Sequence, residues 1–138
     1  MKTIFLFAAM LASAAAHACP GLAVEDGWIR EAPPGAMMTA GYARLVNTGT
    51  KPLTIDGARA RGFEGVELHH TVVEDGLSRM REGRLEIAAG GSAALAPGGW
   101  HLMLFGAERA PAAGETVRVT LSCGKHEREF LFTVRTDR

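Results

Sequence analysis

Turn-forming residues divide this chain into many short segments. Turns rich in glycine, proline, asparagine or aspartate recur at 33–35, 47–49, 74–76, 90–91, 97–99 and 123–125. Glycine supplies the positive φ angles that tight turns need, and proline presets φ near its turn value. No segment between these turns keeps a sustained helical period. Short segments at this spacing predict an all-β sandwich or barrel.

Alternating apolar residues locate the strands and their inner faces. We expect strands around 22–30, 40–47, 52–60, 64–74, 77–81, 84–88, 92–96, 100–106, 115–122 and 126–135. In the last two, Val117, Val119 and Leu121, and then Phe130, Phe132 and Val134, occupy every second position. Side chains on a strand point alternately to its two faces, so each strand has one apolar face. Two antiparallel sheets packed through such faces are the simplest fold.

The amino terminus has the pattern of a cleaved export signal. Lys2 gives a positive start, the apolar run from Ile4 to Ala16 follows, and Ala16-His17-Ala18 matches the small-x-small cleavage pattern. The run is too short to span a bilayer, which takes about 20 helical residues. We therefore predict that residues 1–18 are removed and that residues 19–138 form one domain in the periplasm, without membrane insertion.

Charge and cysteine content limit the partners of this mature domain. Without Lys2 the 15 basic residues become 14, against 15 acidic ones, so no basic excess favours nucleic acid or an anionic membrane. The two cysteines, Cys19 and Cys123, can form one disulfide in an oxidising compartment. The alternative is that Cys19 carries a lipid, but a lipoprotein signal normally has Leu three residues earlier, where this chain has Ala16.

Histidine and methionine are placed as metal ligands rather than as core residues. In His101-Leu102-Met103, the phase set by Trp100, Leu102 and Leu104 puts His101 and Met103 together on the opposite face. His69 likewise projects outward between Leu68 and His70, and the turn at 74–76 folds the next segment back, which brings Met80 alongside His69. We therefore expect His69, Met80, His101 and Met103 to converge at one rim.

This donor set favours copper. Thioether sulfur suits Cu(I), and imidazole binds copper in either oxidation state, whereas zinc prefers Cys, His and carboxylate. Two neutral imidazoles and two neutral thioethers suit one monovalent ion per chain. Ordinary packing remains the competing explanation for each residue taken alone. The roles of His70, His126, Met37 and Met38 stay open.

The spacing of these residues resembles the PCuAC family of periplasmic copper chaperones. His69 and Met80 have ten residues between them, Met80 and His101 have twenty, and Met103 completes a His-x-Met pair. The second interval is one residue shorter than usual in the family. Further resemblance lies in 27–35, 40–49, 86–91 and 95–103, so that it covers about residues 22–135. One departure is Thr71, where some members carry an additional Met.

The resemblance implies a cupredoxin-like Greek-key β-sandwich that binds one Cu(I). It also implies delivery of copper toward the CuA centre of cytochrome c oxidase subunit II, often with a thiol-bearing copper chaperone. We expect a monomer and no enzymatic activity, because the sequence has no Gly-x-Ser-x-Gly, no His-Glu-x-x-His and no Cys paired with a general base.

Three other functions stay open at this point. The first is copper buffering or storage, which needs the same ligands. The second is an electron-transfer blue-copper protein, which would need Cys123 as a thiolate ligand and a methionine after His126, and the sequence has no such methionine. The third is an immunoglobulin-like binding module without a metal.

Overall fold

A computed structural model describes residues 19–136 of the chain, and these contain strands and no helix. The strands are β1 (Leu22–Arg30), β2 (Met38–Asn47), β3 (Leu53–Ile55), β4 (Gly57–Ala60), β5 (Phe63–Glu74), β6 (Leu77–Glu82), β7 (Leu85–Ile87), β8 (Ser92–Leu95), β9 (His101–Ala107), β10 (Thr116–Cys123) and β11 (His126–Arg135). The predicted all-β class is therefore confirmed. The predicted export signal, 1–18, lies outside the described residues. Within 19–136 there is no helix that could cross a membrane.

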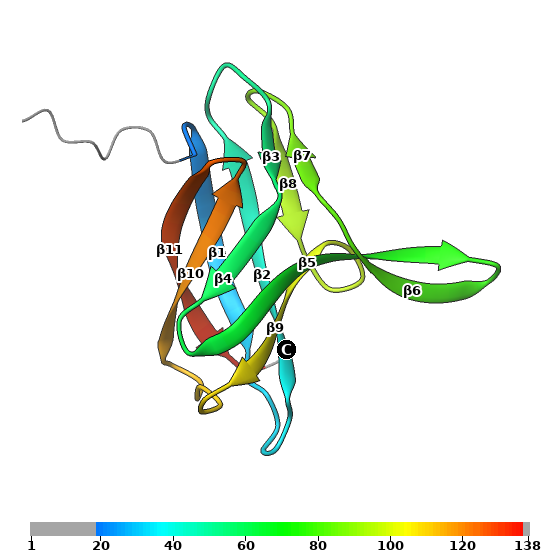
Figure 1. The fold of residues 1–138 in the computed structure, drawn as a ribbon, viewed down its shortest axis with the longest axis vertical. Helices are drawn as coiled ribbons and strands as arrows, with labels where there is room; N and C mark the ends of the chain where they lie inside the picture. The colour runs from blue at the N-terminus through cyan, green and yellow to red at the C-terminus, as the bar shows by residue number, and fades with distance from the viewer. Residues whose placement is uncertain (1–18, 137–138) are drawn as a thin grey trace, which may run out of the picture.

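The strands close into a barrel (Figure 1). Their hydrogen-bonded order is β1-β11-β10-β4-β5-β9-β2, and β1 also pairs with β2, which closes the ring. β1 runs parallel to β11 and antiparallel to β2. The two expected sheets are therefore joined through β1, which pairs with β11 and with β2. Neither sheet has an unpaired edge strand at this junction.

The segment expected as one strand at 52–60 is two strands in different sheets. β3 pairs with β7, whereas β4 pairs with β10 and β5. Asp56 separates them: its backbone N–H donates to the Ser122 carbonyl at 3.0 Å, and its carboxylate accepts from the Gly124 N–H at 3.1 Å. A side chain that bonds to a turn backbone in this way interrupts a strand.

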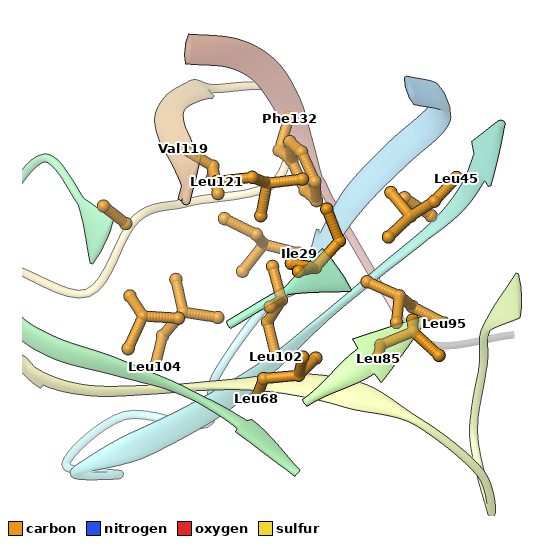
Figure 2. Close-up of a cluster of buried hydrophobic side chains, with 14 of the residues drawn as sticks. Ile29, Leu45, Leu68, Leu85, Leu95, Leu102, Leu104, Val119, Leu121 and Phe132 are labelled. Carbon is orange, nitrogen blue, oxygen red and sulfur yellow. The ribbon is translucent and has the colours of Figure 1, made fainter. Parts of the chain in front are cut away.

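The barrel interior is filled by the residues whose alternation marked the inner faces. Val119, Leu121 and Phe132 are fully buried, and so are Leu102 and Leu104 of β9. Figure 2 shows these side chains converging from β9, β10 and β11 onto Ile29 of β1. Fully burying an apolar side chain of this size stabilises a fold by about 1.5–3 kcal/mol. The phase of β9 matters most for function, because it directs His101 and Met103 away from this core.

A disulfide between Cys19 and Cys123 ties the start of the described chain to the end of β10. The two Cα atoms are 5.7 Å apart, and 104 positions of sequence separate the residues. The predicted pairing is therefore confirmed. It also removes the blue-copper alternative, because a disulfide sulfur is not available as a thiolate ligand.

Asn47 holds together the loops at one end of the barrel. Its buried side-chain amide donates to the carbonyls of Lys51 at 2.7 Å and Ile87 at 3.1 Å, and its carbonyl accepts from the Gly49 N–H at 3.0 Å. We expect Asn47→Ala to lower the free energy of unfolding by about 1–3 kcal/mol, because buried backbone groups lose their partners. Urea unfolding measures this.

The matched control is Thr48→Ala, which removes an exposed hydrogen bond from the Thr48 hydroxyl to the Gly21 carbonyl. Water can replace that partner, so we expect Thr48→Ala to cost no more than about 0.5 kcal/mol. Equal effects of the two substitutions would contradict the assigned role of Asn47.

The hairpin of β5 and β6 projects from the barrel as an arm (Figure 1). β6 pairs only with β5, and all of its residues are exposed. Arg81 donates two hydrogen bonds to the Glu74 carboxylate, at 2.9 and 2.6 Å, which lowers the pKa of Glu74. The arm is therefore held by its own backbone pairing and by surface ion pairs rather than by a core.

Candidate metal centre

The two predicted histidine ligands face each other on neighbouring strands. His69 of β5 lies directly opposite His101 of β9 in the antiparallel register. Their ring centroids are 5.8 Å apart, and the rings meet edge to face at 76°. His101 is only 4% exposed, although it points away from the barrel core. The predicted convergence of these two residues is thus present in the fold.

The hydrogen bonds of each ring identify the nitrogen that is free to bind a metal. His101 Nδ1 lies 3.1 Å from the Gly99 carbonyl oxygen, which can only accept, so we assign the proton to Nδ1 and the lone pair to Nε2. His69 Nε2 lies 2.7 Å from Glu67 Oε2, which by the same argument leaves the lone pair on Nδ1. Both lone-pair nitrogens are buried and have no hydrogen-bond partner among the described residues.

The turn before β9 places the Gly99 carbonyl. Gly99 N–H donates to the Ala96 carbonyl at 3.0 Å, and Ala96 N–H donates to the Trp100 carbonyl at 2.8 Å. Gly98 has φ +81°, which the Pro97-Gly98-Gly99 turn requires and glycine adopts without strain. This turn therefore positions the carbonyl that accepts from His101 Nδ1 in our assignment.

Met103 lies on the same face as the two histidines. It is half-buried between Glu67 of β5 and Ala40 of β2, its partners in the register. Relative to His69 it is the diagonal neighbour on the adjacent strand, a position about 7–8 Å away that a long side chain can span. The expectation that Met103 leaves the core face while Leu102 and Leu104 fill the core is confirmed.

Met80 lies farther along the arm than we expected. The register of β5 and β6 pairs His69 with Glu82 and Thr71 with Met80. Met80 is therefore diagonal to His69, on the side nearer the hairpin turn, and it is 60% exposed. The two-residue turn fixes this register, because Asp75 and Gly76 both have positive φ, as in a tight hairpin turn. Counting outward from that turn would have given the correct pairing from sequence.

The other histidines and methionines among residues 19–136 lie outside this cluster. His70 stacks on Trp100 with ring centroids 4.4 Å apart, and His126 is exposed at the start of β11, opposite Cys123. Met37 and Met38 are exposed, and Met38 lies opposite Phe105 on β9. Of these four, Met38 is the neighbour of Met103 on the same face, two positions along β2 from Ala40.

Glu67 is the site residue that sequence reasoning did not single out. Its position two residues before His69 places both side chains on the outer face of β5, and this was visible in the alternation. Its hydrogen bond to the ring was not, because it depends on side-chain rotamers. Within residues 19–136 no group of three or more His, Cys, Asp or Glu side chains is placed to hold a metal ion.

Comparison with known proteins places the chain in a family. Residues 22–130 match the family described as "Putative lipoprotein LpqE-like". A relative from Leifsonia xyli subsp. xyli, named "Putative lipoprotein Lxx21020", is 36% identical over 103 residues, which is 73% of this chain. The chain spans only 61% of that relative's length.

Solved structures show the same fold. The apo PCuAC domain from PmoF1 superposes with a TM-score of 0.74 at 22% identity, over 88% of this chain and 98% of that domain. The solution structure of Cu(I)-DR1885 from Deinococcus radiodurans gives a TM-score of 0.69 at 29% identity, over 90% of this chain and 84% of that protein. The expected cupredoxin-like fold is therefore confirmed, and the chain belongs to the LpqE-like family and has the fold of PCuAC domains.

Proposed function

We propose that this protein is an exported copper chaperone that holds one Cu(I) between His69, Met80, His101 and Met103. The observation that carries the proposal is the pair of buried lone-pair nitrogens, His69 Nδ1 and His101 Nε2, on directly opposed residues. A buried nitrogen without a partner is costly unless it binds something. Metal–nitrogen bonds are about 2 Å long, so two rings that share an ion lie roughly 6 Å apart centre to centre, which agrees with the 5.8 Å found here.

The other two donors favour Cu(I) over harder ions. Met103 and Met80 lie diagonal to His69 on its two sides along the strand, so thioethers flank the histidine pair. Thioether sulfur is a poor ligand for zinc or magnesium and a good one for Cu(I). Because all four ligands are neutral, the site keeps the single positive charge of Cu(I), which one carboxylate can balance. The Glu67 carboxylate is hydrogen-bonded to the His69 ring.

The arrangement also suits the transfer of copper. The histidines and Met103 lie on hydrogen-bonded barrel strands, whereas Met80 is exposed on the arm. An acceptor can replace an exposed thioether first and then take the ion by ligand exchange. This supports delivery over catalysis, so we propose a non-enzymatic protein that acts as a monomer in the periplasm.

A Cu(I) titration tests the binding step. The mature protein, kept with its disulfide intact and titrated against a chromophoric Cu(I) chelator in anaerobic buffer, should take up one Cu(I) per chain. Zn(II) should not compete at equal concentration, because the thioethers contribute little to zinc. Failure to take up Cu(I) from the chelator would remove the proposal and favour the metal-free immunoglobulin-like binding module.

A transfer experiment separates delivery from buffering or storage. The candidate acceptors are the soluble CuA domain of cytochrome c oxidase subunit II and a thiol-bearing copper chaperone, each reduced and free of metal. Each acceptor is mixed with the Cu(I)-loaded protein, and the two proteins are then separated so that the copper in each can be measured. Copper should reach the acceptor faster from this protein than from a Cu(I)–chelator complex. Transfer at the rate of spontaneous copper loss would support a buffering or storage protein instead.

A further inference from the structure

The Glu67 carboxylate is hydrogen-bonded to Nε2 of the His69 ring. Glu67 Oε2 lies 2.7 Å from His69 Nε2. Both residues are on the outer face of β5, two positions apart, and the His69 side chain is only 17% exposed. Met103 lies opposite Glu67, as His101 lies opposite His69, so Glu67 borders the proposed ligand cluster, with its side chain 42% exposed.

We propose that Glu67 is a positioning residue that makes His69 bind Cu(I) through Nδ1, while His101 binds through Nε2. This deepens the proposed function and rests on it, since Cu(I) is the ligand. The N–H at His69 Nε2 donates to the carboxylate, which leaves the lone pair on Nδ1, a buried atom without a hydrogen-bond partner among the described residues. Which nitrogen of a histidine binds a metal is set by the hydrogen bond that the other nitrogen makes.

The opposed register gives a reason for using two different nitrogens. Nδ1 is close to the backbone and Nε2 is far from it, so one ring must reach across while the other binds near its own strand. The rings already meet at 76°, with one edge directed at the other ring. Binding through Nε2 of both rings would require His69 to break its hydrogen bond to Glu67 and turn about its side-chain bonds.

Glu67 contributes in a second way, through its charge. A carboxylate that accepts from the ring N–H strengthens the opposite nitrogen as a donor and offsets the charge of the bound ion. The Gly99 carbonyl gives His101 the same orientation but no charge. Through its hydrogen bond to His69, Glu67 can therefore alter both the geometry and the charge of the site, whereas the Gly99 carbonyl can alter geometry alone.

Nitrogen-15 NMR of the histidine rings in the metal-free protein tests the hydrogen bonds directly. We expect His69 to carry its proton on Nε2 and His101 to carry its proton on Nδ1. After loading with Cu(I), the nitrogen whose shift changes by coordination should be Nδ1 of His69 and Nε2 of His101. Coordination of His69 through Nε2, or a proton on His69 Nδ1 in the metal-free protein, would overturn the proposal.

Three variants separate hydrogen bonding from charge. Glu67→Ala removes both and should weaken Cu(I) binding by about 10- to 100-fold. Glu67→Gln keeps an oxygen acceptor without the charge, so it should retain Nδ1 coordination and lose less affinity. The control is Glu82→Gln, because Glu82 is the other register partner of His69 and, within the described residues, it makes no hydrogen bond to the ring. The Cu(I) affinity of this variant should stay within about twofold of wild type, because exposed charges interact weakly.

These results distinguish the proposal from the function on which it rests. Wild-type affinity in Glu67→Ala would overturn the role of Glu67 and leave copper binding intact. The NMR experiment separates positioning from a general loss of stability. A variant that is only less stable, as Glu67→Ala could be where Glu67→Gln is not, would still coordinate Cu(I) through the same nitrogen of His69. If the wild-type protein took up no Cu(I), the function would fail, and the spectrum of the metal-free protein would still show whether Glu67 fixes the His69 tautomer.

Discussion

Replacing Cys19 and Cys123 together with alanine should lower the free energy of unfolding by about 3–5 kcal/mol. The disulfide closes a loop that spans 104 positions, nearly the whole described chain, so it restricts the unfolded state strongly. Cys19 is fully buried, and alanine leaves no unpaired polar group there, whereas serine would. Urea unfolding of the mature protein measures the difference.

Reduced wild-type protein is the matched comparison for this variant. Reduction breaks the same cross-link without changing a side chain, so both samples should unfold at similar urea concentrations, well below the oxidised protein. The barrel itself should persist, because its strand pairings do not depend on the two cysteine side chains. Equal stability of the oxidised and reduced proteins would show that the cross-link restricts little of the unfolded chain.

The same disulfide bears on the lipoprotein names of the relatives. A lipid and a disulfide both use the Cys19 sulfur, so one molecule cannot carry both. The sulfur of Cys19 is buried against β10, with the Leu121 carbonyl oxygen 3.8 Å away. We therefore expect the exported protein to have the intact mass of residues 19–138 with one disulfide. A mass increased by a diacylglyceryl group would show that Cys19 is an anchor and that Cys123 is a free thiol.

Much of the fold could be predicted because turn residues and alternation are local signals. Asp75-Gly76 marks the hairpin turn between β5 and β6, and Pro97-Gly98-Gly99 marks the turn between β8 and β9, which both pair with β2. Alternation then decides which side chains enter the core, as with Leu102 and Leu104. The same signal placed His69, His101 and Met103 on the outer faces of their strands, so three of the four proposed ligands followed from strand phase.

The features that escaped prediction depend on contacts between distant residues. Closure of the barrel through the parallel pairing of β1 with β11 joins the two ends of the chain and leaves no local pattern. The break at Asp56 depends on a hydrogen bond to the turn at Gly124. The burial of His101 and the contact between Glu67 and His69 likewise depend on which strands become neighbours and which rotamers they permit.

Replacing Met103 with leucine should weaken Cu(I) binding by more than about 100-fold, since loss of a direct ligand exceeds the 10- to 100-fold typical of outer partners. Leucine roughly conserves volume, so the free energy of unfolding should change by less than about 1.5 kcal/mol. Cu(II) binding through the histidines should suffer less, because it depends less on thioethers. Competition with a chromophoric Cu(I) chelator, alongside thermal unfolding of the metal-free protein, measures these effects.

Met80→Leu should weaken Cu(I) binding less than Met103→Leu does, and the reason is structural. Met103 is held between β5 and β2, whereas Met80 is exposed on an arm that only β5 supports, so binding must order its side chain at a cost in entropy. Met38→Leu is the control, because Met38 is equally exposed but lies opposite Phe105, away from both histidines. Wild-type Cu(I) affinity in both Met80→Leu and Met103→Leu would defeat the two-histidine, two-methionine site. A larger loss in Met80→Leu would instead mean that the arm, rather than the barrel face, supplies the dominant thioether.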